Sequence, residues 1–245
     1  MYTKSPSEAV VPARQRLVWQ VLTQSLDSVT DGSSAPSVLD CGGGTGSLAV
    51  PLAQVGATVT VLDISVDALA TLHRRSVEAG VADRVTPVQG DIEALREVVA
   101  AESFDLVLVH GTLEDVDDVQ ATFAEVVATV RPGGLLSVLV NNPVASVLAR
   151  ALAGELVEAL DELHELDSSS AHPAGPEVVR QLCLQAGLIV EQTQGVGVFT
   201  ELVPGSALEA PGAAEALVAL EVHGAARVPF VDIASRVHTL ARRPK

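Results

Sequence analysis

The sequence carries four glycines within five positions, directly after a short apolar run that ends in an aspartate. The stretch reads VLDCGGGTG and places Asp40 before Gly42, Gly43, Gly44 and Gly46. Glycine permits positive φ angles and lets another group approach the main chain closely. At a strand-to-helix turn it also leaves free N–H groups, which a phosphate, a nucleoside or a carboxylate can use. Because four glycines exceed what a tight turn requires, the pattern predicts a ligand-binding loop.

Acidic residues follow at the expected ends of the next two strands. The segment VTVLDIS ends its apolar run at Asp63 and Ile64, and VQGDIEAL places Asp91 and Ile92 after a third run. A carboxylate after the second strand can accept hydrogen bonds from both hydroxyls of a ribose. The glycines also satisfy G-x-G-x-x-A, a dinucleotide fingerprint. An NAD-linked oxidoreductase and a non-catalytic nucleoside-binding protein therefore remain alternatives.

Each acid also has a structural explanation. Asp91 could cap the following helix, and Ser65 is better placed than Asp63 to cap the one before it. Asp40 could fix the glycine loop by accepting backbone N–H groups. These explanations do not exclude ligand contacts at the same positions.

The elements that must position these residues alternate between strands and amphipathic helices. Such alternation with short connections predicts right-handed crossovers and a parallel sheet, which binds ligands beyond the carboxyl ends of its strands. The expected strands are 38–40, 58–62, 84–88, 104–109 and 135–140, and the expected helices are 47–55, 66–79, 92–100 and 116–130.

The flanking segments complete one predicted domain over residues 1–245. Residues 1–34 form an N-terminal helical segment with a helix at 13–26, and 35–141 form the ligand-binding core. A long helical stretch at 143–166 lies in an insertion or lid, 142–176. The C-terminal part, 177–245, is expected to complete the sheet with strands at 188–193, 196–202 and 236–240 and helices at 177–186 and 210–223.

Composition restricts the class of protein. The formal net charge of −16 argues against broad, non-specific binding of nucleic acid. The two cysteines, Cys41 and Cys183, show no spacing typical of a metal site. No apolar run reaches the length needed to span a bilayer, and the first residues lack a signal-peptide pattern. A cytoplasmic protein without a metal or a membrane partner is expected.

The order of these motifs resembles class I S-adenosylmethionine-dependent methyltransferases. The acidic-x-Gly-x-Gly-x-Gly pattern that starts at Asp40 is similar to their first motif, and RPGGLLSVLV is similar to the approach to their fifth strand. The resemblance implies a Rossmann-like α/β fold, with a mostly parallel seven-stranded sheet and helices on both faces. It also implies S-adenosylmethionine as cofactor and S-adenosylhomocysteine as product. In that pattern Asp63 binds the ribose, while Asp91 and Ile92 contact the adenine.

A closer resemblance extends over nearly the whole chain. RQRLVWQVL, VHGTLEDV, GVGVFTELV and the C-terminal LEVHGAARVPFVDIASRVHTLARRPK resemble segments of the bacterial tRNA wobble-uridine methyltransferases, which esterify 5-carboxymethoxyuridine. The resemblance implies that Arg14 contacts the methionine carboxylate of the cofactor, that Gly42 and Gly43 pass close to it, and that His110 lies near the sulfonium. His110 could also act as a general base if its pKa lies near neutrality.

Two departures from that family concern the acceptor. Its lysine-rich run after the fifth strand is replaced here by the acidic GELVEALDELHELDSSSAHPAG, and its arginine and histidine in the late strand are Gly197 and Thr200. Both changes remove positive charge. We therefore expect transfer of a methyl group to oxygen or nitrogen of a small molecule, a carboxylate being one candidate, by a monomer or homodimer. Methyl esterification of the tRNA wobble uridine is the alternative.

Overall fold

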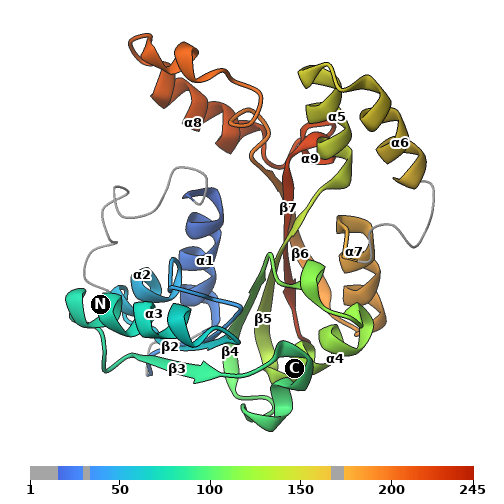
Figure 1. Ribbon diagram of the computed structural model, residues 1–245. Coiled ribbons are helices and arrows are strands. Elements are labelled where there is room, and N and C mark those ends of the chain that lie inside the picture. Colours follow the sequence, from blue (N-terminus) through green and yellow to red (C-terminus); the bar gives the residue numbers. More distant parts are fainter. Residues whose placement is uncertain (1–15, 30–33, 167–173) are drawn as a thin grey trace.

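A seven-stranded sheet forms the centre of the computed structural model, which describes residues 16–29, 34–166 and 174–245 (Figure 1). The strand order is β3-β2-β1-β4-β5-β7-β6. The first five strands in sequence are parallel, and β7 runs antiparallel to both of its neighbours. The predicted Rossmann-like, mostly parallel sheet is confirmed. Its strands are β1 (Ser37–Cys41), β2 (Thr58–Asp63), β3 (Val85–Gln89), β4 (Phe104–His110), β5 (Val130–Asn141), β6 (Ile189–Val196) and β7 (Arg236–Arg242).

Helices cover both faces of the sheet. Of those described, α1, α2 and α3 contribute to one buried cluster, and α4 and α7 to the other. The helices are α1 (Arg16–Val29), α2 (Ala49–Gln54), α3 (Val66–Glu78), α4 (Val119–Thr129), α5 (Pro143–Ala153), α6 (Leu156–Leu166), α7 (Pro176–Gln185), α8 (Ala213–Gly224) and α9 (Phe230–Ile233), with 3₁₀ turns η2 (Ile92–Glu97), η3 (Leu113–Asp115) and η4 (Gly205–Glu209).

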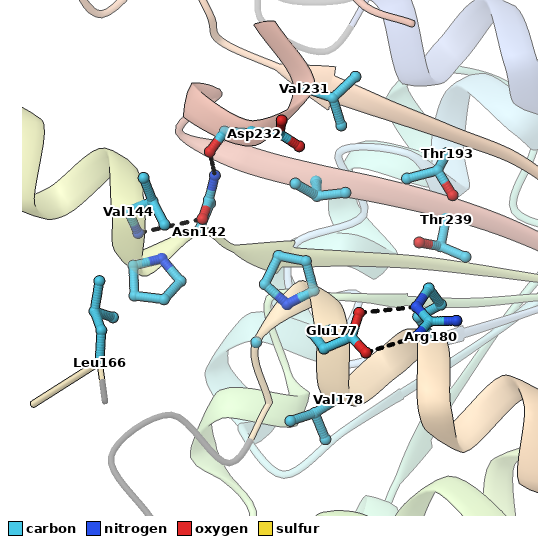
Figure 2. Close-up of a pocket in the computed structure, with 14 residues that line it drawn as sticks. Asn142, Val144, Leu166, Glu177, Val178, Arg180, Thr193, Val231, Asp232 and Thr239 are labelled. Atoms are coloured by element: carbon cyan, nitrogen blue, oxygen red, sulfur yellow. Dashed lines mark hydrogen bonds and ion pairs between the residues drawn. The ribbon is translucent and has the colours of Figure 1, made fainter. Parts of the chain in front are cut away.

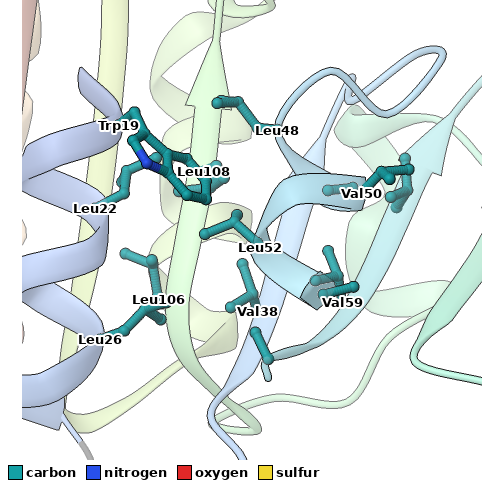
Figure 3. Close-up of a cluster of buried hydrophobic side chains, with 14 of the residues drawn as sticks. Trp19, Leu22, Leu26, Val38, Leu48, Val50, Leu52, Val59, Leu106 and Leu108 are labelled. Atoms are coloured by element: carbon teal, nitrogen blue, oxygen red, sulfur yellow. The ribbon is translucent and has the colours of Figure 1, made fainter. Parts of the chain in front are cut away.

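The core beneath α1 and α2 shows how a chain poor in aromatic residues fills its interior. Leu22 and Leu26 of α1, together with Leu52 of α2, pack over Leu106 and Leu108 of the sheet (Figure 3). Trp19 lies at the upper end of this cluster and is 8% exposed. Aliphatic side chains on both layers exclude water from the faces of the strands, so the strand ends are held in a fixed arrangement.

Some helix boundaries follow from capping residues. Ser65 caps α3 by accepting a hydrogen bond from the Ala68 amide, and Asp118 caps α4 through the Ala121 amide. The latter cap explains why α4 begins at Val119, after the separate turn η3, and not at residue 116 as expected.

The structure differs from the expected elements in three further places. The helical stretch at 143–166 is two helices, because Gly154 adopts a left-handed φ of 85° and ends α5. The helix expected at 92–100 is the shorter 3₁₀ turn η2. The strand expected at 196–202 is absent: β6 runs from Ile189 to Val196, and Gly197, at φ 77°, turns the backbone away.

The two ends of the sheet carry different features. The α5–α6 hairpin and α8 project beyond the end of β7 where that strand begins (Figure 1). The basic residues Arg242 and Arg243 lie at the opposite end, where Arg242 pairs in register with Ile189, the first residue of β6. Within the described residues, no helix is both long enough and apolar enough to cross a bilayer.

Candidate cofactor cleft

The glycine loop leaves β1 at Cys41 and folds back over the ends of β1 and β2. Three of its glycines have positive φ angles: 71° at Gly42, 54° at Gly44 and 78° at Gly46. The Gly42 amide donates to the Leu62 carbonyl at 2.8 Å. A Cβ at Gly42 would lie 2.3 Å from Thr112 Oγ1, and one at Gly43 would lie 2.5 Å from Asp40 Oδ2. The loop therefore requires glycine for both its dihedral angles and its close contacts.

Asp63, and not Asp40, secures this loop. The Gly44 amide donates to Asp63 Oδ2 at 2.9 Å, and the Ser65 amide donates to Asp63 Oδ1 at 2.8 Å. Among the described residues, no hydrogen bond reaches the Asp40 carboxyl group. The expectation that Asp40 holds the loop by accepting backbone N–H groups is therefore wrong, because its side chain lies beneath Gly43 and the neighbouring strand supplies the acceptor.

A cavity of about 280 Å³ lies beside the loop at the ends of β2 and β3. Asp63 and Asp91 provide carboxylates to its wall. Ile64 is 71% exposed although it is a large apolar residue, and Ile92 lies in the same wall. Asp91 also accepts a hydrogen bond from the Glu93 amide and so caps η2. The same carboxylate therefore caps a helical turn and lines the cavity. Hydrogen-bond acceptors beside apolar surface suit a nucleoside, because it carries hydroxyl donors on its ribose and an amino donor on its flat base.

A second, smaller pocket of about 120 Å³ adjoins the first. Gly42 lines both cavities, so the glycine loop borders both of them. The wall of the smaller pocket comes from α1, the glycine loop and the ends of β4, β5 and β7. It consists of Val18, Asp40, Gly42, Gly43, Ser47, Leu48, His110, Leu139 and Arg236.

Burial changes the ionisation of Asp40. The side chain is 4% exposed, and desolvation, followed by repulsion from Asp63, raises the pKa of Asp40 to about 7. The carboxyl group is thus held near its point of half-ionisation at neutral pH. A cationic group in the smaller pocket would favour its ionised form.

His110 belongs to a polar network whose described members include no acid, although Asp40 lines the same pocket. Its Nε2 lies 2.8 Å from Ser137 Oγ, and that hydroxyl lies 2.7 Å from Nε2 of His238. Burial, followed by electrostatic interaction with His238 and with Arg236, lowers the pKa of His110 well below its ordinary value. This direction of shift disfavours His110 as a general base, a role that calls for a pKa near neutrality.

The structure brings most of the residues predicted for the site to one edge of the sheet. Asp63, Ile64, Asp91 and Ile92 line the larger cavity, and Asp40, Gly43 and His110 line the smaller one, with Gly42 between them. Gly44 and Gly46 line neither cavity and instead shape the loop. Arg14 lies outside the described residues.

Sequence reasoning did not assign several residues that the fold adds. Thr112 packs against Gly42, Arg236 lines the smaller pocket, and Ser137 and His238 contact His110 through the network. Arg236 and His238 belong to a C-terminal segment that already showed the family resemblance. Their approach to His110 depends on β7 pairing with β5, which no local pattern reveals.

A larger cavity of about 450 Å³ lies apart from this cleft. Asn142, the N-cap of α5, lies in its wall beside Val144 (Figure 2) and donates to the Asp232 carbonyl at 2.9 Å. The ion pair between Glu177 and Arg180 lies along one side. No residue of the glycine loop and neither Asp63 nor Asp91 borders it, so it is distinct from the candidate cofactor cleft.

Comparison with known proteins agrees with this geometry. The family model described as "Methyltransferase domain" matches residues 39–138, which run from β1 into β5. The chain carries a methyltransferase domain. The glycine loop, Asp63, Asp91 and His110 all fall within that match. The sequence-based assignment to the methyltransferases is thereby confirmed.

Relatives of this methyltransferase domain differ in what they act on. The tRNA 5-carboxymethoxyuridine methyltransferase of Escherichia coli K12 is 26% identical over 95% of this chain and 88% of its own length. A ubiquinone biosynthesis O-methyltransferase of Methylobacterium sp. 4-46 is 34% identical over 65% of this chain and 62% of its own. An S-adenosylmethionine-dependent methyltransferase from Mesorhizobium loti has a TM-score of 0.60 at 20% identity, covering 95% of this chain and all of that one.

Proposed function

We propose that this protein transfers a methyl group from S-adenosylmethionine to an oxygen or nitrogen atom of a small molecule, and that the cofactor lies across the two adjoining cavities. The observation that carries the proposal is the shared wall at Gly42. It joins a cavity suited to a nucleoside to a pocket that contains one acid, one guanidinium and one imidazole. An extended ligand with a nucleoside at one end and charged groups at the other fits that combination.

The residues of the cleft divide between the parts of the cofactor. Ile64 and Ile92 offer apolar surface to the adenine ring, and Asp91 can accept from its amino group. Asp63 already accepts two amides, and each carboxylate oxygen has a further lone pair for a ribose hydroxyl. Asp40 lies in the smaller pocket, where its carboxylate would meet the ammonium group.

S-adenosylmethionine supplies a methyl group that its sulfonium makes electrophilic. The contribution of the protein is then mainly to position the acceptor in line with that methyl group. Leu139 and Leu48 limit water at the smaller pocket. A carboxylate acceptor attacks through a lone pair and has no proton to lose, whereas a neutral alcohol or amine must release one. This wall offers His110 only as a neutral imidazole.

The distribution of positive charge favours a small acceptor over tRNA. Among the described residues of the C-terminal basic stretch, Arg242 pairs with Glu191 and Arg243 pairs with Glu102, both at the end of the sheet opposite the cleft. In the α5–α6 hairpin, Arg150 pairs with Glu155 and Glu162. Arg236 alone of these arginines lines the smaller pocket. A polyanion that binds through phosphate contacts needs more positive charge at the site than this single arginine supplies.

Calorimetric titration with S-adenosylhomocysteine tests the cofactor assignment. The Asp63→Ala variant loses the ribose acceptor and the anchor of the loop, and we expect its affinity to fall about 10- to 100-fold, since hydrogen bonds to a charged group contribute roughly 1.5–3 kcal/mol. Asp67→Ala, an exposed acid in the first turn of α3, is the matched control and should bind normally. Equal affinity of both variants would remove Asp63 from the site.

The acceptor class requires a separate experiment. The protein is incubated with methyl-labelled S-adenosylmethionine and either bulk tRNA or the small-molecule fraction of a cell extract from its own host. We expect label in the small-molecule fraction and none in tRNA. Label in the tRNA would establish the alternative, methyl esterification of the wobble uridine, as the activity of this protein.

A further inference from the structure

A row of polar side chains runs through the sheet from the smaller pocket, and four adjacent strands supply one residue each. These are His110 of β4, Ser137 of β5, His238 of β7 and Gln194 of β6. Ser137 and His238 are fully buried, and Gln194 is 2% exposed. Beyond the two contacts of Ser137 given above, Gln194 Nε2 lies 3.4 Å from Nδ1 of His238. We refer to these four residues as the polar network.

The direction of each hydrogen bond follows from the far end of the network. Gln192 Nε2 donates to Gln194 Oε1 at 2.6 Å, which leaves the Gln194 amide nitrogen to donate to His238 Nδ1. A neutral imidazole that accepts at one nitrogen carries its proton on the other. His238 therefore donates from Nε2 to Ser137 Oγ. The single hydroxyl proton of Ser137 is then donated to Nε2 of His110.

His110 must therefore carry its own proton on Nδ1. Among the described residues no hydrogen-bond partner lies at that nitrogen, and His110 lines the smaller pocket beside Arg236 and Asp40. We propose that Ser137, His238 and Gln194 are positioning residues that fix His110 as the Nδ1–H tautomer, which offers a hydrogen-bond donor to the ligand in this pocket. The imidazole rings of His110 and His238 have centroids 5.8 Å apart and are nearly perpendicular, so the hydroxyl of Ser137 connects them.

Neutral histidines are a requirement of this arrangement. Burial lowers the pKa of His238 to about 4, and burial is also the largest cause of the lowered pKa of His110, beside which Arg236 and Asp40 are the charged groups of the pocket. Both imidazoles then hold one proton each at neutral pH. The role of His110 toward the ligand rests on the proposed function. In that role His110 donates a hydrogen bond to an oxygen of the cofactor or acceptor and does not remove a proton from the acceptor.

Nitrogen-15 NMR of protein labelled in its histidines tests the proposal without any substrate. Long-range ¹⁵N–¹H spectra distinguish protonated from unprotonated ring nitrogens, and the His110→Asn variant assigns the His110 signals. We expect His110 to be protonated at Nδ1 and His238 at Nε2 in the free protein and with S-adenosylhomocysteine bound. A wild-type spectrum with the proton of His110 on Nε2 overturns the proposal whether or not the cofactor binds.

Two variants test the positioning role. In Gln194→Glu the new carboxylate accepts from Nδ1 of His238, so every bond in the network should reverse and the His110 proton should move to Nε2. In Ser137→Ala the connection is lost, and the spectrum of His110 should no longer show a single Nδ1–H form. Ser137→Thr keeps the hydroxyl and should restore it.

Ser25→Ala is the control for loss of a buried hydroxyl. Ser25 is 6% exposed in α1, and its hydroxyl donates only to the Val21 carbonyl at 2.7 Å. This variant should leave the histidine spectrum unchanged. If Gln194→Glu and Ser137→Ala fold and leave the His110 tautomer as in the wild type, the network does not set it. Calorimetry with S-adenosylhomocysteine on the same samples reports separately on the proposed function.

Discussion

Replacing the buried acid Asp40 by asparagine should change how the stability of this protein depends on pH. The pKa of Asp40 rises from an ordinary value of 3.8 to about 7 in the folded protein, chiefly because burial disfavours the charged carboxylate. The folded state therefore holds a proton on Asp40 at pH values where the unfolded chain has lost it. Stability from this group is fully present below pH 3.8 and is lost as the pH rises to about 7.

The size of the effect follows from the shift. A difference of roughly three pKa units corresponds to about 4 kcal/mol of unfolding free energy, since each unit is worth about 1.36 kcal/mol. Roughly 3 kcal/mol of this loss falls between pH 5 and pH 8 when the linkage relation is applied with the two pKa values. This is a large share of a typical domain stability of 5–15 kcal/mol.

Urea unfolding of the wild type and Asp40→Asn at several pH values from 5 to 8 measures the effect. The variant should gain stability relative to the wild type as the pH rises, because its amide does not ionise. The difference between the two proteins is the quantity to follow, since His110 and His238 titrate in both and cancel. A difference that stays constant from pH 5 to pH 8 would show that Asp40 ionises freely in the fold and would refute the reasoning.

Further tests concern the glycine loop and the buried thiols. Gly46→Ala should destabilise the protein by about 2–5 kcal/mol in urea unfolding, because backbone strain at a φ of 78° (about 1–2 kcal/mol) adds to the overpacking of a Cβ 2.2 Å from Leu72 Cδ1 (about 1–3 kcal/mol). Gly44→Ala, whose nearest contact is 3.8 Å away, should cost only the backbone strain of about 1–2 kcal/mol. Equal losses in the two variants would argue against the packing of Leu72. Burial raises the pKa of both thiols, that of Cys183 to about 11. Cys41 and Cys183 should therefore resist iodoacetamide at pH 7 until urea unfolds the protein, as followed by mass spectrometry. Rapid labelling of the native protein would contradict their burial.

The sequence by itself determined the order of the elements and the principal acids of the cleft. Strand and helix periodicity are local properties, so four of the five parallel strands were predicted within one residue at each end, whereas β5 begins five residues earlier than predicted. The glycine loop, Asp63 and Asp91 each follow a strand directly. Because carboxyl ends of parallel strands meet at one edge of a sheet, their proximity could be predicted without coordinates.

Only the tertiary structure decided which acid holds the loop and what His110 can do. Asp40 and Asp63 look equivalent in sequence, yet the carboxylate of the neighbouring strand reaches the Gly44 amide while Asp40 is buried beneath Gly43. The state of His110 depends on Ser137, His238 and Gln194, which lie 27 to 128 positions further along the chain and meet it only through the pairing of β4, β5, β7 and β6. Hydrogen bonds across strands depend on register and burial, and these are properties of the whole sheet.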